Sequence, residues 1–311
     1  MPPFNVEPGT AGGDSGGGLK EVFTLDDLRA WPAERPPLRL AVLGDPVAHS
    51  ASPPMHNAAL AHCGIDARYT RLHIRSNELP EAFRLLPKQG FIGVNCTIPH
   101  KFAALALVDR ADDHARRIGV VNTVIVEGEK LVGYNTDGPG LVRAVRADFG
   151  ADLRDLRVMV LGAGGGAGRA AAMQCAIEKC PRIALINRTP EKLAVLRAEL
   201  ESFFPTDRLA VGDMTAQRAE TDLIINCTSL GMKPGEPSPI PAGLLNADHL
   251  LYDTIYTAAR TPFLRAGDAV GARGANGLSM LLHQGALSFE IWFQRPAPLE
   301  VMRAALLAHA R

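Results

Sequence analysis

One segment limits the possible folds of this chain more than any other: a strand pattern that leads into a glycine-rich turn and then into a helix pattern. It reads VMVLGAGGGAGRA and spans residues 158–170. The segment belongs to a longer alternation of apolar strand patterns and helix patterns that starts at residue 38. Alternation of this kind is typical of α/β proteins, in which helices cover the faces of a sheet. The sequence therefore predicts an α/β fold.

The alternation falls into two units, because a second strand–helix series starts near residue 139. In the first unit we expect strands at 38–44, 67–74 and 91–98, a strand–turn–strand at 122–137, and helices at 57–63, 78–86, 101–108 and 112–118. In the second unit we expect a helix at 138–148 and strands at 157–163, 182–188, 209–214, 222–229 and 249–256. Two helix patterns, 278–293 and 298–310, close the chain. A length of 311 residues also favours two domains, at roughly 150 residues for each.

The residues before the first strand pattern differ in composition from the rest. Residues 1–18 end in AGGDSGGG, which is typical of a flexible tail. The sequence TLDDLRAW at 24–31 predicts a short helix with Thr24 as its N-cap, and the prolines that follow end it. We therefore expect residues 1–36 to form an extension that belongs to neither domain.

Charge and cysteine content exclude several classes of function. The chain has 33 basic and 33 acidic residues, and a net charge of zero argues against nucleic-acid or membrane-surface partners. No apolar run approaches the ~20 residues of a membrane span, and the first 20 residues lack the order of a signal peptide. Five cysteines without a CxxC pair predict reduced thiols, and hence a cytoplasmic protein without a metal site.

The glycine-rich turn has the spacing GxGxxA, with Gly162, Gly164 and Ala167 at its three small positions. The first glycine permits the tight turn, the second allows a pyrophosphate to approach the backbone, and the third small residue permits close packing of helix and strand. The helix N-terminus then offers free N–H groups to the phosphates. The alternative is a tight strand-to-helix turn without a ligand.

The end of the next strand distinguishes between two dinucleotides. An NAD site typically carries an acidic residue there for the ribose 2′-hydroxyl, whereas this chain has Asn187, Arg188, Thr189 and Lys192. An arginine fork can hold a 2′-phosphate through charge-assisted hydrogen bonds, so NADP is the expected cofactor. Alternatively, Arg188 is a solvated side chain and Thr189 a helix N-cap before Pro190.

Polar residues gather where the strands of the first unit end, which is where ligands bind in open α/β sheets. They are Ser50 and Ser52 in a loop, Asn95, Thr97 and Lys101 around the next strand end, Asn122, and Asp137. Hydroxyls, amides, one lysine and one aspartate suit a polyhydroxylated anion. Each residue alone is explained as well by a turn, a cap or a solvated charge, so the prediction rests on their occurring together.

Taken in order, these motifs resemble those of the shikimate dehydrogenase family. The matching segments lie between residues 38 and 293 and include GDPVAHSASPPMHN, GVNCTIPHK, GVVNTV, GYNTDGPG, GAGGGAGRA, NRTPEK, INCTSLGM, YDTIY and NGLSMLLHQGA. The resemblance implies two α/β domains with a cleft between them. The substrate domain would span 37–138 and be completed by helices in 283–311, and a Rossmann-like NADP domain would span 139–282.

The resemblance also implies roles for individual residues. Lys101 and Asp137 would be catalytic. The substrate, shikimate or 3-dehydroshikimate, would be held by Ser50, Ser52, Asn95, Thr97, Asn122, Tyr256 and Gln284. The cofactor would be held by Asp113, Gly162, Ala163, Gly164, Gly165, Gly166, Asn187, Arg188, Thr189, Lys192, Thr254 and Gly277. Two departures are visible: Thr257 and Ala258 replace a usual Asn-Pro, and Phe293 and Gln294 replace the Thr-Gly that usually follows the tryptophan.

The implied reaction is reversible hydride transfer between NADPH and the ketone of 3-dehydroshikimate, a step of the shikimate pathway of aromatic amino-acid biosynthesis. A protonated Lys101 would stabilise the charge on the ketone oxygen and deliver the proton, and Asp137 would hold the ammonium. Because free lysine has a pKa of about 10.4, we expect alcohol oxidation to speed up toward alkaline pH. Two alternatives remain open: a catabolic quinate/shikimate dehydrogenase and a non-catalytic ligand sensor. The oligomeric state also stays open between monomer and homodimer.

Overall fold

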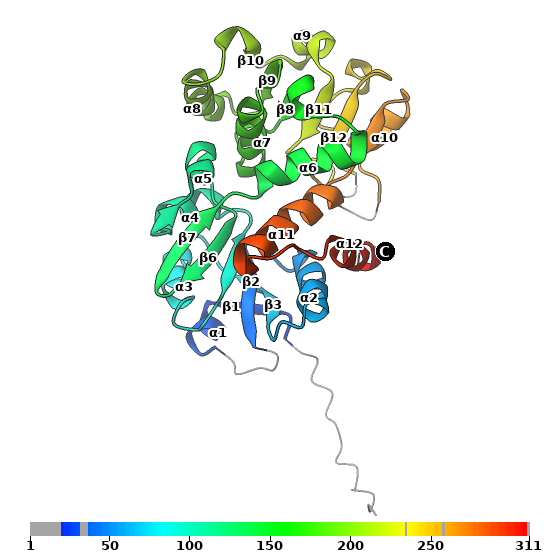
Figure 1. The fold of residues 1–311 in the computed structure, drawn as a ribbon. Coiled ribbons are helices and arrows are strands. Elements are labelled where there is room, and N and C mark those ends of the chain that lie inside the picture. The colour runs from blue at the N-terminus through cyan, green and yellow to red at the C-terminus, as the bar shows by residue number, and fades with distance from the viewer. Residues whose placement is uncertain (1–19, 32–36, 234, 257–258, 310–311) are drawn as a thin grey trace, which may run out of the picture.

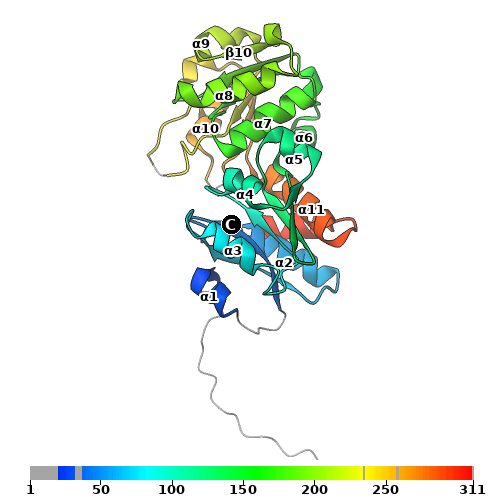
Figure 2. The ribbon, with the colours of Figure 1, turned by 90° about the vertical axis from the view of Figure 1, so that its left-hand side faces the viewer.

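The computed structural model describes residues 20–31, 37–233, 235–256 and 259–309, and within these it contains two β-sheets (Figure 1). The seven-stranded sheet has the order β1-β3-β2-β4-β6-β7-β5, and the six-stranded sheet has the order β10-β9-β8-β11-β12-β13. The two sheets lie at opposite ends of the molecule, and Figure 2 shows the same division from the side. The fold is α/β, as the sequence predicted.

The first sheet is mixed. Its strands are β1 Val22–Thr24, β2 Leu38–Gly44, β3 Arg68–His73, β4 Gly93–Cys96, β5 Arg110–Ala111, β6 Thr123–Glu127 and β7 Lys130–Tyr134. Strand β6 runs antiparallel to β4 and β7, and the remaining pairs are parallel. The helices that follow these strands are α1 Leu25–Arg29, α2 Ser52–His62, α3 Leu79–Leu85, α4 Lys101–Leu107 and α5 Asp113–Ile118.

The second sheet is parallel throughout, as expected for strands buried on both faces by crossover helices. Its strands are β8 Arg157–Leu161, β9 Arg182–Ile186, β10 Leu209–Val211, β11 Leu223–Asn226, β12 Leu250–Asp253 and β13 Arg273–Ala275. Its helices are α6 Asp137–Phe149, α7 Gly166–Ile177, α8 Pro190–Glu201, α9 Met214–Gln217 and α10 Pro262–Asp268. Residues from both of its faces are buried, Val158 and Val160 in one core cluster and Met159 and Leu161 in another.

The N-terminal segment corrects one expectation. Strand β1 pairs in parallel with β3 at the edge of the seven-stranded sheet. Phe23, Leu25 and Leu28 are buried in the core beneath it. Val22–Thr24 therefore belong to the sheet and Leu25–Arg29 pack into its core, although the sequence predicted that all of residues 1–36 lie outside both domains. The predicted glycine-rich tail lies outside the described residues.

The chain closes with α11 Leu278–Phe293 and α12 Leu299–His309. Both helices contribute to the core cluster that also contains Leu40 and Met55 from β2 and α2. Trp292 donates from Nε1 to the Val124 carbonyl at 3.0 Å. Gln294 ends α11 with a φ of +50°, a left-handed conformation that favours glycine. At one departure from the family pattern, Phe293–Gln294, α11 therefore still packs into the core. The other departure, Thr257–Ala258, lies outside the described residues.

Candidate active site

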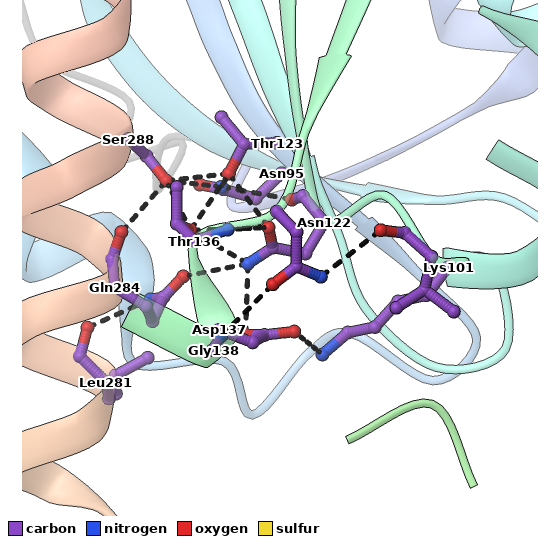
Figure 3. Close-up of polar contacts among 12 residues, drawn as sticks. Asn95, Lys101, Asn122, Thr123, Thr136, Asp137, Gly138, Leu281, Gln284 and Ser288 are labelled. Carbon is purple, nitrogen blue, oxygen red and sulfur yellow. Dashed lines mark hydrogen bonds and ion pairs between the residues drawn. The ribbon is translucent and has the colours of Figure 1, made fainter. Parts of the chain in front are cut away.

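Lys101 and Asp137 form an ion pair between the first residues of α4 and α6 (Figure 3). The Lys101 Nζ lies 2.6 Å from the Asp137 Oδ2, and the two side chains are 14% and 7% exposed. Asp137 lies in the first turn of α6, where the partial positive charge of a helix N-terminus is complementary to an acidic side chain. The sequence predicted Lys101 and Asp137 as partners, and the structure brings them together.

The second oxygen of Asp137 has a different partner. Asn122 Nδ2 donates to Asp137 Oδ1 at 3.0 Å and to Thr136 Oγ1 at 2.9 Å. The Asn122 amide is itself fixed, because its Oδ1 accepts from the Thr136 N–H at 2.7 Å. The Asp137 carboxylate is therefore held from both sides, with one oxygen toward Lys101 and the other toward Asn122.

A buried layer of hydroxyls and amides supports Asn122 from behind (Figure 3). Asn95 Nδ2 lies 3.0 Å from both Thr123 Oγ1 and Ser288 Oγ. Gln284 joins this layer through its Oε1, which accepts from Asn122 Nδ2 at 3.4 Å. Sequence reasoning singled out Asn95 and Gln284 but missed Thr123, Thr136 and Ser288. Ser288 follows Gln284 by four residues on α11, so helical spacing was an available signal.

The predicted carboxylate-binding residues also lie together. The Ser52 N–H donates to Ser50 Oγ at 3.3 Å. Burial raises the pKa of Tyr256, while hydrogen bonds with Ser50 and the Ala51 backbone lower it, which places the Tyr256 hydroxyl beside this loop. Ser52 is the first residue of α2 rather than a loop residue, since the prolines after it fit the first helical positions.

Thr97 lies at the rim of the same region. A methyl group on Gly44, at the end of β2, would come within 2.5 Å of Thr97 Cγ2. The Thr97 N–H donates to the Leu43 carbonyl at 2.9 Å. Thr97 is therefore fixed beside the end of β2, close to the start of the loop that carries Ser50.

The glycine-rich turn joins β8 to α7 and has the geometry that an anion requires. Gly162 has a φ of +79°, which permits the tight turn. Gly165 is exposed just before the twelve-residue helix α7, whose first N–H groups are free to bind phosphate. The small residue that packs closely is Gly168, because a methyl group there would lie 2.2 Å from the Gly162 carbonyl oxygen. The sequence had assigned this packing role to Ala167.

Two of the residues after β9, Asn187 and Lys192, contact the turn. Asn187 Oδ1 accepts from the Gly164 N–H at 3.3 Å, so this side chain fixes the turn. A methyl group on Gly164 would lie 2.8 Å from Lys192 Cβ, which places the Lys192 stem over the turn. Arg188 is exposed, and Thr189 occupies the N-cap position of α8. Two exposed cations beside an open helix N-terminus fit an anionic dinucleotide.

The remaining predicted cofactor residues divide into two groups. Gly277 and Thr254 are in contact, since a methyl group on Gly277 would lie 2.3 Å from the Thr254 carbonyl oxygen. Asp113 is 96% exposed on α5 and pairs with Arg116. Among the contacts of the described residues, none links Asp113 to the turn or to Lys101, so the structure does not bring it into the site.

The cofactor turn and the ion pair are neighbours. A methyl group on Gly166, the first residue of α7, would lie 3.5 Å from Lys101 Cδ and 3.8 Å from the Phe102 ring. Two thiols near this junction are poor nucleophiles, because burial raises the pKa of Cys96 and Cys227 to about 12. The chemistry that the site offers is therefore that of an ammonium and a carboxylate beside an anion-binding turn.

Comparisons with known proteins agree with this geometry. Residues 42–124 match the family model of the shikimate dehydrogenase substrate binding domain, and residues 277–307 match that of the shikimate 5′-dehydrogenase C-terminal domain. The shikimate dehydrogenase (NADP(+)) of Symbiobacterium thermophilum is 41% identical over 276 residues, which cover 86% of this chain and 93% of that protein. This chain belongs to the shikimate dehydrogenase family.

Solved structures of this family have the same fold. The crystal structure of shikimate 5-dehydrogenase from Thermus thermophilus, in complex with NADP(H) and shikimate, has a TM-score of 0.79 and 36% identity. The match covers 88% of this chain and 99% of that one. Quinate dehydrogenase from Corynebacterium glutamicum, in complex with NAD, has a TM-score of 0.78 and 25% identity, with the same coverage of each chain. The resemblance inferred from the sequence motifs is confirmed.

Proposed function

We propose that this chain is an NADP-dependent shikimate dehydrogenase, an oxidoreductase that reversibly reduces 3-dehydroshikimate to shikimate in the shikimate pathway of aromatic amino-acid biosynthesis. The observation that carries the proposal is the Lys101–Asp137 pair, whose lysine stem lies against the first residue of the helix that follows the glycine-rich turn. This arrangement supports a role for Lys101 as the proton donor between a cofactor at the turn and a ketone substrate. The relatives named above support the same reaction.

NADPH, when bound, supplies the hydride. The backbone of Gly162–Gly166 and the N-terminus of α7 would bind its pyrophosphate, with Arg188 and Lys192 on the 2′-phosphate. As hydride reaches the ketone carbon, negative charge grows on the ketone oxygen. The Lys101 ammonium would stabilise that charge and then donate its proton to the oxygen. When shikimate is oxidised, the hydride and the proton would move in the opposite direction.

Asp137 would contact both the proton donor, Lys101, and the substrate. One of its oxygens holds the Lys101 ammonium, and the carboxylate would also accept a hydrogen bond from a substrate hydroxyl. Asn95, Asn122 and Gln284 would complete the hydroxyl side, and Thr97 would contribute from the rim. Ser50, Ser52 and Tyr256 would bind the carboxylate at the other end of the ring.

The direct test is an assay of the purified protein with shikimate and NADP⁺, which follows NADPH by its absorbance. We expect shikimate-dependent NADPH formation, with a higher kcat/KM for NADP⁺ than for NAD⁺ because Arg188 and Lys192 favour the 2′-phosphate. The same assay is repeated with quinate and NAD⁺ as the second pair of substrate and cofactor. Preference for that pair would instead support the quinate dehydrogenase activity, which the fold match to the Corynebacterium glutamicum protein also allows.

Absence of turnover with either acid would contradict an enzymatic role and favour a ligand sensor. We further propose that the protein acts in the cytoplasm as a monomer or homodimer, without nucleic-acid partners. The described helices include none that is both long and apolar enough to cross a membrane. Size-exclusion chromatography with light scattering determines which of the two assemblies forms.

A further inference from the structure

Strand β3 carries three side chains on one face that meet polar partners, and two of these partners lie in the loop that follows β2. Side chains two residues apart on a strand point to the same side, and here Tyr69, Arg71 and His73 each meet a polar partner. The Tyr69 hydroxyl donates to Asn95 Oδ1 at 2.8 Å. His73 Nε2 lies 2.8 Å from an Asp45 carboxylate oxygen.

Arg71, the middle residue, holds the part of the loop that would bind the substrate carboxylate. Its Nε and Nη2 donate to the Ser50 carbonyl oxygen at 3.2 Å and 2.7 Å. The residue is only 8% exposed. A guanidinium that donates two hydrogen bonds to one carbonyl fixes the position of that peptide, and with it the Ser50 side chain.

The charge of Arg71 is weakly compensated. Among the described residues its ion-pair partner is Glu21, whose side chain is 81% exposed and lies 3.7 Å from Nη1. A buried charge is costly unless a charge of opposite sign lies close to it. The hydroxyl groups of Ser50 and Tyr256 carry no charge, and Lys101 is already paired with Asp137. The carboxylate end of the site thus has a buried cation that a bound anion would neutralise.

The field of this cation reaches the site. Burial raises the pKa of both Tyr69 and Tyr256, and the positive charge of Arg71 acts on both in the opposite direction. Tyr256 contacts the Ser50 loop, as described above, so a carboxylate bound there would lie in the same field. At short range through a poorly solvated medium, such an interaction is much stronger than in water.

We propose that Arg71 is a positioning and specificity-determining residue for the substrate carboxylate: it fixes the Ser50 peptide and supplies the buried positive charge that favours a carboxylate over a neutral group at that end of the ring. The inference rests on the proposed function and goes beyond it, because it assigns the preference for an acid substrate to a residue outside the family motifs. The hydride-transfer machinery at Lys101 is not involved.

The test compares shikimate with its neutral methyl ester, which has the same reacting hydroxyl. In Arg71→Gln we expect kcat/KM for shikimate to fall at least about tenfold, mainly through KM, because a hydrogen-bonded charge is lost from a buried site. We expect kcat/KM for the ester to fall much less, so that the preference for the acid shrinks. Arg75→Gln removes an exposed arginine from the segment just after β3 and should leave the preference unchanged.

Arg71→Lys keeps the charge but loses the forked hydrogen bonds. It should retain most of the preference for the acid, and it tests the proposal even if Arg71→Gln fails to fold. Equal losses for acid and ester in Arg71→Gln, or loss of the preference in Arg71→Lys, would overturn the inference while the proposed function stands. No turnover of shikimate by the wild-type protein would overturn both.

Discussion

The individual side chains of the site are held by partners that leave each of them little freedom. Asp137 has one oxygen on Lys101 and the other on Asn122, and the Asn122 amide is fixed in turn by Thr136. The stem of Lys101 lies beside Gly166. The ammonium is therefore positioned before the substrate arrives, which is the condition for efficient proton transfer.

Lys101→Ala should lower kcat far more than it raises KM, since the ammonium acts mainly on the charge that develops during hydride transfer. A loss of about 10²–10⁴-fold in kcat is the usual contribution of a positioned proton donor. Steady-state kinetics with shikimate and NADP⁺ measure both constants. Lys130→Ala, at an exposed lysine on β7, is the matched control and should leave them unchanged. An unchanged kcat in Lys101→Ala would remove Lys101 from the chemistry.

At the same scale, chemical type decided which site residues the sequence could reveal. Lys101 and Asp137 stand in motifs with few other charges, so each was a natural candidate. Thr123 and Ser288 are small hydroxyl residues of kinds found throughout any chain, and only the fold shows that they meet Asn95. Nothing in the sequence indicated a role for Arg71 either, because an arginine on an alternating strand is usually solvated.

At the scale of elements, strong apolar patterns fixed the strands that build the sheets. The predicted strand 38–44 and the predicted helix 278–293 match β2 and α11 in the structure. Very short elements escaped prediction, including the two-residue strand β5 and the three-residue strand β1. Such strands depend on the neighbour with which they pair. Two or three residues are too few to show the alternation from which a strand is predicted.

The strand–turn–helix unit of the cofactor site depends on one glycine that the fingerprint did not identify. In Gly168→Ala the added methyl group would lie 2.2 Å from the Gly162 carbonyl oxygen, so the turn or α7 must move. We expect KM for NADP⁺ to rise about tenfold, equivalent to ~1.4 kcal/mol of binding free energy. KM for shikimate should change much less.

Gly243→Ala is the control for this substitution, because nothing lies within 4 Å of a methyl group at that position. It should leave both KM values and the unfolding midpoint unchanged. Titration of each variant with NADP⁺ by calorimetry separates binding from turnover. Equal NADP⁺ affinity in Gly168→Ala and the wild type would show that the turn tolerates the methyl group and that Gly168 has no part in cofactor binding.

For the whole molecule, a net charge of zero hides an uneven distribution of charged and titratable groups. Burial lowers the pKa of His56 to about 3, from an ordinary value of 6.5. His100, His114 and His283 are shifted in the same direction by burial. Between pH 6.5 and about pH 3 the unfolded chain binds a proton at His56 and the folded protein does not. The free energy of unfolding therefore decreases as the pH falls.

His56 is the sharpest test of this effect, because it is fully buried, stacks on Tyr69 at 4.5 Å, and has no hydrogen-bond partner for either ring nitrogen among the described residues. From about pH 7 to about pH 5 the wild-type protein should lose ~2 kcal/mol more unfolding free energy than His56→Phe, at ~1.4 kcal/mol for each pH unit below 6.5. Urea unfolding followed by circular dichroism at both pH values measures the difference.

The control for this comparison is His62→Phe, at an exposed histidine on the same helix, which should behave as the wild type does. The carboxyl groups of Asp148 and of the buried Asp253 have raised pKa values and act in the opposite sense, but they are common to all three proteins and cancel in the comparison. Parallel losses in the wild type and His56→Phe would mean that His56 does not limit stability in acid.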